Sequence, residues 1–405
     1  MIGILRNELK HFRALSKKAQ ILLISYALQG MADPFIKIFL NAYIWQSNKN
    51  PLSVILYNMG DFLILPFIFV LNGFFLKKIK AHYLYFMGAV GIGMSALFVL
   101  FYTWFDPIAF LLYGCIYGVG HGFYWANRNL LSLQETESKT RNYFTGLNLS
   151  IDFITSIFVP LIAGWFIGFG MRLHIIRFQT SYIVLMLFAF FLLVSAGVML
   201  ITHRFEKEVI TRLHLVRVTQ RWAKVRLLMV GFGMAGAANF FLPTVLILMN
   251  LGKEEILGTL TAFASLICAI GMYLFGRYAG VHHRKQVLIA SIIFGLITTG
   301  ILAFCKTKFG ILFFITFNSL TVEFAGLAGE PLILDIVDTE HTLGANDNYA
   351  FVIDRELFLN IGRISIYLIC ILLFNTFGMS YSFFFFPLIS WIVLAVLSLF
   401  TLREM

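Results

Sequence analysis

Charged residues are scarce in this sequence: only 13% of its 405 residues are Asp, Glu, Lys or Arg, and 60% are hydrophobic. Soluble domains carry about 25% charged residues, so this composition indicates an integral membrane protein. The sequence also lacks the alternating segments of about ten residues that build a membrane β-barrel. Backbone polar groups in lipid must be satisfied within a helix or a closed barrel. The fold class that remains is an all-α membrane protein.

Cysteine and catalytic motifs are also sparse. The four cysteines lie in apolar runs without a close-spaced pair, which indicates packing rather than disulfides or metal binding. No phosphate-cradling G-x-x-x-x-G-K-[ST] loop is present, so ATP is not expected to drive this protein. His282-His283 lacks partners at metal-ligand spacing, and no soluble segment is long enough for an active site. We therefore expect no enzyme, no cofactor and no metal.

Long apolar runs dominate what is present. A span needs roughly 20 residues, and twelve runs reach that length. Their connections are short except for a basic stretch between the sixth and seventh runs. We predict the twelve spans at 19–45, 52–76, 82–105, 108–131, 143–169, 180–202, 226–250, 255–278, 287–305, 310–334, 349–376 and 379–402.

The net charge of +11 is distributed along the membrane borders, which argues against a nucleic-acid partner. With the N-terminus inside, 21 of the 31 Lys and Arg residues fall in inner segments and 6 in outer loops. Inner loops of membrane proteins are enriched in Lys and Arg. We therefore expect a multi-pass protein of the cytoplasmic (inner) membrane with both termini cytoplasmic, acting as a monomer on a small-molecule substrate among membrane lipids.

The chain repeats itself. Gly30-x-Ala32-Asp33 matches Gly236-x-Ala238-Asn239, and Asn142-Tyr143 matches Asn348-Tyr349, both at an offset of 206 residues. A constant offset at equivalent spans indicates duplication. We predict an amphipathic cytoplasmic N-terminus at 1–18 without a signal-peptide core, six-helix bundles at 19–202 and 226–405, and a basic linker at 203–225.

Three short segments resemble motifs of the major facilitator superfamily, and the likeness covers the whole chain. Residues 73–80 (GFFLKKIK) stand where that family has its G-x-x-x-D-R-x-G-R-K loop, with Lys77 at the acidic position. The copy at 276–285 also lacks the acid. Residues 159–164 (VPLIAG) resemble the G-P-x-x-G-G element of antiporters. The resemblance implies two pseudo-symmetric six-helix bundles that move a solute by alternating access.

A polar stripe crosses the first span. Gln29, Asp33, Lys37 and Asn41 recur every fourth residue, so they share one helix face. A charge in mid-membrane is costly unless it faces a partner or a water-filled cavity. Asp33 and Lys37 therefore either neutralise each other along the helix or line a transport pathway.

Other polar residues in the spans give a candidate site. The predicted substrate ligands are the cations Lys37 and Arg363 and the amides Gln29, Asn41, Asn239 and Asn360. The predicted proton carriers are Asp33, Glu323, Asp61 and Asp152. The predicted gate, formed by charges that pair across the two halves, comprises Arg128, Glu330, Asp354, Arg355 and Glu356. We interpret His121, among the glycines of the fourth span, as a packing residue.

Lys37 and Arg363 favour an anionic solute, since ammonium and guanidinium groups hold carboxylate or phosphate. We expect a carboxylate metabolite or a siderophore-like compound, moved with proton exchange. One alternative is proton-driven export of hydrophobic cations, in which the same acids bind the drug and aromatic side chains stack on it. A lipid flippase on the same fold is the other, and the direction of transport stays open.

Overall fold

The computed structural model describes residues 12–101, 106–136, 138–203, 205, 219–278, 284–342 and 348–402. Most of the predicted N-terminal segment, most of the predicted linker and the side chain of Glu330 lie outside the described residues. The division of the chain into segments at those boundaries stays a prediction.

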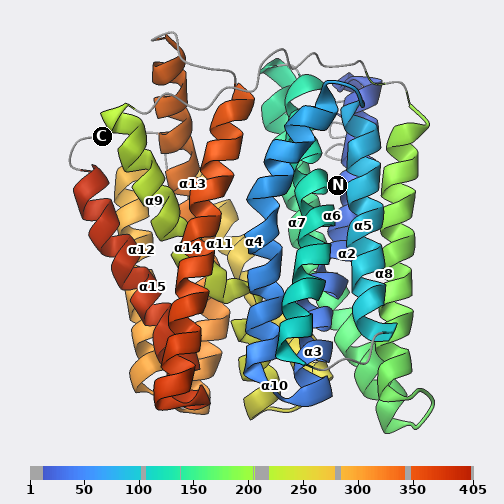
Figure 1. The fold of residues 1–405 in the computed structure, drawn as a ribbon, viewed down its shortest axis with the longest axis vertical. Helices are drawn as coiled ribbons and strands as arrows, with labels where there is room; N and C mark the ends of the chain where they lie inside the picture. Colours follow the sequence, from blue (N-terminus) through green and yellow to red (C-terminus); the bar gives the residue numbers. More distant parts are fainter. Residues whose placement is uncertain are drawn as a thin grey trace.

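The first half of the chain forms helices that run lengthwise through the molecule in alternating directions (Figure 1). Two of them begin alike: the side chains of Asn50 and Asp106 accept from backbone amides of the first turn, and a proline follows each. Such a cap satisfies an amide that has no partner within the helix. These helices are α2 (Lys17–Pro34), η1 (Phe35–Leu40), α3 (Asn41–Asn48), α4 (Pro51–Leu76), α5 (Ala81–Phe101), α6 (Pro107–Gln134), α7 (Ser138–Arg172) and α8 (Phe178–Ile201).

The second half repeats this arrangement. In each half the first span packs on the fifth and sixth spans, and the third span packs on the fourth and sixth. The halves meet where α4 packs on α14, α7 on α11 and α3 on α10. The helices of this half are α9 (Gln220–Ala237), η2 (Ala238–Phe240), α10 (Leu242–Asn250), α11 (Glu254–Tyr278), α12 (Arg284–Phe304), α13 (Lys308–Thr342), α14 (Asn348–Phe377) and α15 (Met379–Leu402).

The predicted architecture of twelve spans in two pseudo-symmetric bundles is confirmed. Among the described residues, eleven segments are long and apolar enough to cross a membrane, and the broken helices α2–α3 and α9–α10 each count as one. The twelfth is α6, whose glycines, tyrosines and histidine make it less hydropathic. It is 28 residues long and packs against α4 and α5. The largest differences from the predicted bounds are in α7 and α13, which continue as helix beyond the apolar run.

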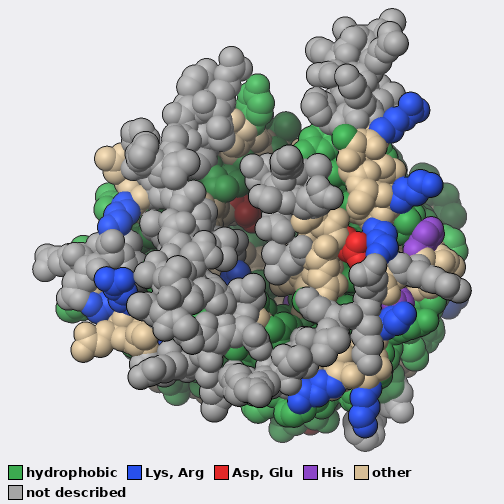
Figure 2. All heavy atoms as spheres, turned by 90° about the horizontal axis from the view of Figure 1, so that it is seen from above, with side chains coloured by type: hydrophobic (Ala, Val, Ile, Leu, Met, Phe, Trp, Pro, Cys, Tyr) green, Lys and Arg blue, Asp and Glu red, His purple; other side chains and the backbone are tan. Residues whose placement is uncertain are grey.

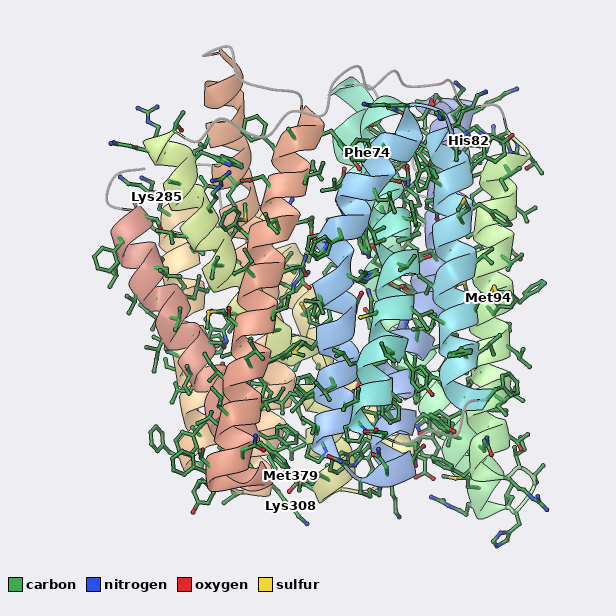
Figure 3. All side chains as sticks on the ribbon, in the orientation of Figure 1. Phe74, His82, Met94, Lys285, Lys308 and Met379 are labelled. Atoms are coloured by element: carbon green, nitrogen blue, oxygen red, sulfur yellow. The ribbon has the colours of Figure 1, made fainter. Side chains whose placement is uncertain are left out.

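The two ends of the bundle differ in charge. We call the upper side the end where α8 and α15 finish and α9 begins, as drawn in Figure 1. Figure 3 places Lys285 there, at the start of α12, and Lys308 at the opposite, lower side, at the start of α13. In Figure 2 many Lys and Arg side chains lie on the upper face. Exposed lysines of that face include Lys17, Lys77 and Lys78.

The first span of each half is irregular at the same depth. Pro34 has no backbone N–H, and the helix widens after it into the π-helical turns of η1. At the equivalent position, 206 residues later, η2 tightens the helix before α10 begins. Both irregular segments face the space between the halves, where broken helices of transporters bind their substrates.

Candidate substrate cavity

A cavity of about 860 Å³ lies between the two halves. Its first-half wall comes from α2, η1, α6 and α7, and its second-half wall from α9 to α11 and α13 to α15. Nine of the predicted site residues line it: Gln29, Asp33, Lys37, Arg128, Asp152, Asn239, Glu323, Arg355 and Arg363. Charged side chains that are far apart in the sequence therefore meet around one space.

Both interpretations of the polar stripe agree with the geometry. Lys37 Nζ donates to Asp33 Oδ2 at 2.8 Å, and Gln29 Nε2 donates to Asp33 Oδ1 at 2.7 Å. All three side chains also line the cavity. The ion pair is partly exposed, with 37% of the Lys37 side chain and 26% of the Asp33 side chain accessible. The pair thus neutralises itself along the helix and still presents polar atoms to a solute.

Arg128 is held within the first half. Its guanidinium lies 3.6 Å from Asp152 and 3.3 Å from the amide oxygen of Asn148. Its other side faces the rings of Tyr26 and Trp125, each centred 4.7 Å from the guanidinium carbon. Arg128 and Asp152 therefore form a second internally neutralised pair on the cavity wall.

Arg363 is held differently. Its guanidinium donates to the amide oxygen of Asn360 at 3.0 Å and stacks on Phe62 and Phe240, whose centres are 4.6 and 5.4 Å from its central carbon. Within the described part of the chain, no carboxylate lies within 4.0 Å of it. A guanidinium has five N–H donors, and a neutral amide occupies only one end of this one. Arg363 is thus a positive charge on the cavity wall without an ionic partner in that part.

Two predicted substrate ligands do not line the cavity. The Asn41 amide donates to the backbone oxygens of Lys37 and Phe240 and accepts from Asn58, so it ties the halves together. Asn360 is fully buried and orients Arg363. The hydrogen-bonding groups of both amides bond to atoms of the same helix or of neighbouring helices. The sequence pattern does not show which of these partners an amide will find.

Two of the predicted gate residues, Arg128 and Asp354, form ion pairs within one half. Asp354 accepts two bonds from Arg226 at 2.7 and 2.8 Å and one from the Trp222 indole at 2.7 Å, all inside the second half. Arg355 lines the cavity, and Glu356, on α14, is half-buried. The ion pairs of Arg128 and Asp354 thus join helices of the same bundle and do not connect the two bundles.

A salt bridge between the halves lies at the lower side and was not predicted. Arg172 of α7 donates to Glu255 of α11 at 2.6 Å. The neighbouring Glu254, 4% exposed, accepts from Gln46 at 3.0 Å and Tyr182 at 3.2 Å. We call these five residues the lower contact. In the sequence, Glu254 and Glu255 look like ordinary acids of a helix first turn, where the helix dipole favours them.

Close backbone packing completes this closure. At Gly164 a Cβ atom would lie 2.5 Å from the backbone oxygen of Glu254, and at Gly258 it would lie 2.2 Å from that of Pro160. Nearer the upper side, α7 and α11 line the cavity instead, through residues such as Asp152 and Cys268. The cavity is closed below by the lower contact.

A second, smaller pocket adjoins the cavity. It measures about 20 Å³ and contains Asp61 of α4 and His121 of α6. His121 Nδ1 lies 2.9 and 3.1 Å from the two carboxylate oxygens of Asp61. Asp61 was predicted as a proton carrier, whereas His121 was interpreted as a packing residue. They are 60 residues apart, so no local pattern could pair them.

Comparison with known proteins shows the same fold. A relative from Bacillus subtilis (strain 168), "Uncharacterized protein YqgE", is 27% identical over 374 residues, covering 88% of this chain and 83% of its own. The crystal structure of the nucleoside transporter NupG matches with a TM-score of 0.65, 13% identity and coverage of 96% and 99%. A bacterial homologue of the iron transporter ferroportin, in its inward-facing state, matches with a TM-score of 0.64, 14% identity and coverage of 96% and 98%.

The family assignment rests on the sequence. The family model "Major Facilitator Superfamily" matches residues 21–341, well over half of the chain. The match spans the first bundle, the central linker and most of the second bundle. The chain therefore belongs to the Major Facilitator Superfamily and is a membrane transporter, not an enzyme.

Proposed function

We propose that this protein moves a small anionic organic solute across the cytoplasmic membrane by alternating access, coupled to protons and acting as a monomer. The observation that carries the proposal is Arg363. Because Lys37 and Arg128 each have a carboxylate partner in the cavity wall, their charges are already balanced. Among the described residues, the guanidinium of Arg363 bonds to an amide and stacks on two rings, and no carboxylate pairs with it. A planar guanidinium binds carboxylate through two parallel bonds.

The competing solutes fit these groups less well. A hydrophobic cation needs an available carboxylate, yet Asp33 and Asp152 are each already close to a cation. Glu323, the other predicted proton carrier on the cavity wall, also has an interaction partner. A metal ion needs several ligands together, and among the described residues no three His, Cys, Asp or Glu side chains are grouped to hold one. A nucleoside, as carried by NupG, would use the amides and aromatic rings of the cavity but would leave Arg363 without a counter-charge.

Ligand binding to the purified protein tests this proposal. We would measure thermal unfolding with a panel of mono-, di- and tricarboxylates, with uridine as a neutral comparator and tetraphenylphosphonium as a cationic one. A ligand at about 100 times its Kd adds about 2.7 kcal/mol to the stability of the state that binds it. At least one carboxylate is expected to raise the melting temperature. Stabilisation by uridine or tetraphenylphosphonium alone would show that the substrate is not an anion.

We also propose that the upper side faces the cytoplasm, so that the structure is closed to the outside. The excess of Lys and Arg in the segments of that side supports this orientation. With Cys305, an exposed natural cysteine, replaced by serine, Lys49→Cys should react with a membrane-impermeant maleimide on intact cells. Lys78→Cys should react only after the cells are opened. Labelling of both from one side would refute the orientation.

A further inference from the structure

We propose that Asp61 and His121 together form the proton-binding site of this transporter and that their protonation strengthens anion binding in the cavity. This inference rests on the proposed function above. Of the four predicted proton carriers it selects Asp61, and it adds His121 as the partner that takes up the proton. The two side chains are almost completely buried, at 5% and 8% exposure, and are joined by bonds of 2.9 and 3.1 Å.

Helix packing fixes the pair in place. At Gly118 a Cβ atom would lie 2.6 Å from the backbone oxygen of Asp61, and at Gly114 it would lie 1.9 Å from that of Tyr57. The backbones of α4 and α6 can approach this closely only because both residues are glycines. The carboxylate and imidazole are therefore held at bonding distance by the bundle itself.

The pair has room for water and a route to the cavity. A pocket needs roughly 10–15 Å³ to hold one water molecule. The pocket beside Asp61 and His121 measures about 20 Å³, and its wall includes Lys37 and Phe240. Both of these also line the large cavity. A proton can thus pass between the cavity and the pair through one water molecule at the Lys37 side chain.

Protonation of the pair changes its net charge. A carboxylate only accepts hydrogen bonds, so the bond to Asp61 places a proton on His121 Nδ1 and leaves Nε2 to bind a second one. With Nε2 empty, the pair carries −1; with Nε2 protonated, it carries 0. The charged groups around the pair are Lys37, Asp33 and Arg363. Its remaining titratable neighbours are neutral side chains, namely Tyr57, Cys115, Tyr117 and Tyr367.

The sign of the coupling follows from these charges. Lys37 and Asp33 cancel each other, and Arg363 contributes +1. The Asp61–His121 pair, the Lys37–Asp33 pair and Arg363 together therefore carry a net charge of 0 before proton uptake and +1 after it. An anion binds more tightly to the positive state, and by linkage the bound anion holds the proton more tightly. Proton and anion would travel together in one direction. Asp33 serves this purpose poorly, because its protonation would strand the charge of Lys37.

Trp125 provides a direct readout of the proton. Its indole ring is centred 6.2 Å from the His121 ring, and a protonated imidazole quenches a neighbouring indole. In the purified full chain, tryptophan fluorescence should therefore change with pH as His121 takes up its second proton. The change should vanish in Trp125→Phe and in His121→Gln. It should move to lower pH in Asp61→Asn, which removes the partner of the imidazolium.

His82→Gln is the matched control, since His82 is also buried but stacks on Tyr83 and Phe205 instead of a tryptophan. It should keep the wild-type titration. A titration that persists in His121→Gln, or stays at the same pH in Asp61→Asn, would overturn the proton site. Thermal unfolding of each variant shows whether it is folded, and Asp61→Asn provides the second test if His121→Gln is not.

Coupling is tested with the carboxylates of the panel. Their binding to wild-type protein should be about 5- to 150-fold tighter at pH 5 than at pH 8, the usual range of coupling between two sites. This pH dependence should flatten in His121→Gln and persist in His82→Gln. An equally strong dependence in His121→Gln would overturn the coupling. If no carboxylate binds wild-type protein at either pH, the proposed function fails, while the fluorescence titration still decides the proton site.

Discussion

Arg363→Gln is expected to weaken binding of a carboxylate substrate by about 10- to 150-fold. A hydrogen bond to a charged group contributes about 1.5–3 kcal/mol, and glutamine supplies neither the charge nor the guanidinium fork. Glutamine can still bond to Asn360 and pack on Phe62 and Phe240, so the local structure should persist. Titration of the purified protein with the carboxylate that stabilises it most in the thermal assay measures the effect.

Two further variants separate charge from position. Arg363→Lys keeps the charge but loses the planar fork, so its affinity should fall between those of wild type and Arg363→Gln. Arg177→Gln is the matched control, because Arg177 is an exposed residue before α8 and does not line the cavity. If Arg363→Gln binds the carboxylate as tightly as Arg177→Gln does, Arg363 is not the anion site.

Gly258→Ala is expected to open the lower side of the cavity and to abolish most transport. The added Cβ atom would lie 2.2 Å from the backbone oxygen of Pro160, which cannot rotate away as a side chain would. Overpacking of this kind costs about 1–3 kcal/mol, and α7 and α11 can relieve it by moving apart. The ratio of the state closed at the lower side to the state open there should therefore fall about 5- to 150-fold.

Accessibility of the cavity from outside measures this shift. A cysteine at Thr261, which lines the cavity, should react with an impermeant maleimide on intact cells about 5- to 150-fold faster in Gly258→Ala than in the parent protein, in line with the population change. Gly146→Ala is the control, since a Cβ atom there meets nothing within 4 Å. Equal labelling rates in the two glycine variants would contradict a role for the close packing of α7 and α11.

The duplicated halves have diverged in chemistry. Asp33 corresponds to Asn239 at the 206-residue offset, and Asn239 accepts a bond from Asn318 instead of a salt bridge. Two ion pairs that line the cavity, Lys37 with Asp33 and Arg128 with Asp152, belong to the first half. The charged residues that the second half contributes to the cavity wall include Glu323, Arg355 and Arg363. A solute between the halves would thus meet a balanced wall on one side and a positive group on the other.

The sequence by itself determined every feature that depends on composition or on neighbours along one helix. Low charge and long apolar runs indicated the membrane class and the twelve spans, and matching residues at a constant offset indicated the repeat. The spacing of Gln29, Asp33 and Lys37 at every fourth residue predicted a shared helix face, and the three side chains bond to one another there, because residues four apart adjoin on any α-helix. Depth in the membrane predicted that Asp33, Lys37, Glu323 and Arg363 face a cavity, and all four line it, since buried charge needs a polar surrounding.

Only the tertiary structure decided which residues of different helices meet. The Asp61–His121 pair spans 60 residues and the Arg172–Glu255 pair spans 83. Their contacts depend on how far each helix is rotated about its axis and how closely two backbones approach. Glycines such as Gly118 and Gly258 set that approach, but a glycine in a sequence does not state which backbone it faces. The proposed proton site and the lower contact were therefore visible only after the helices had packed.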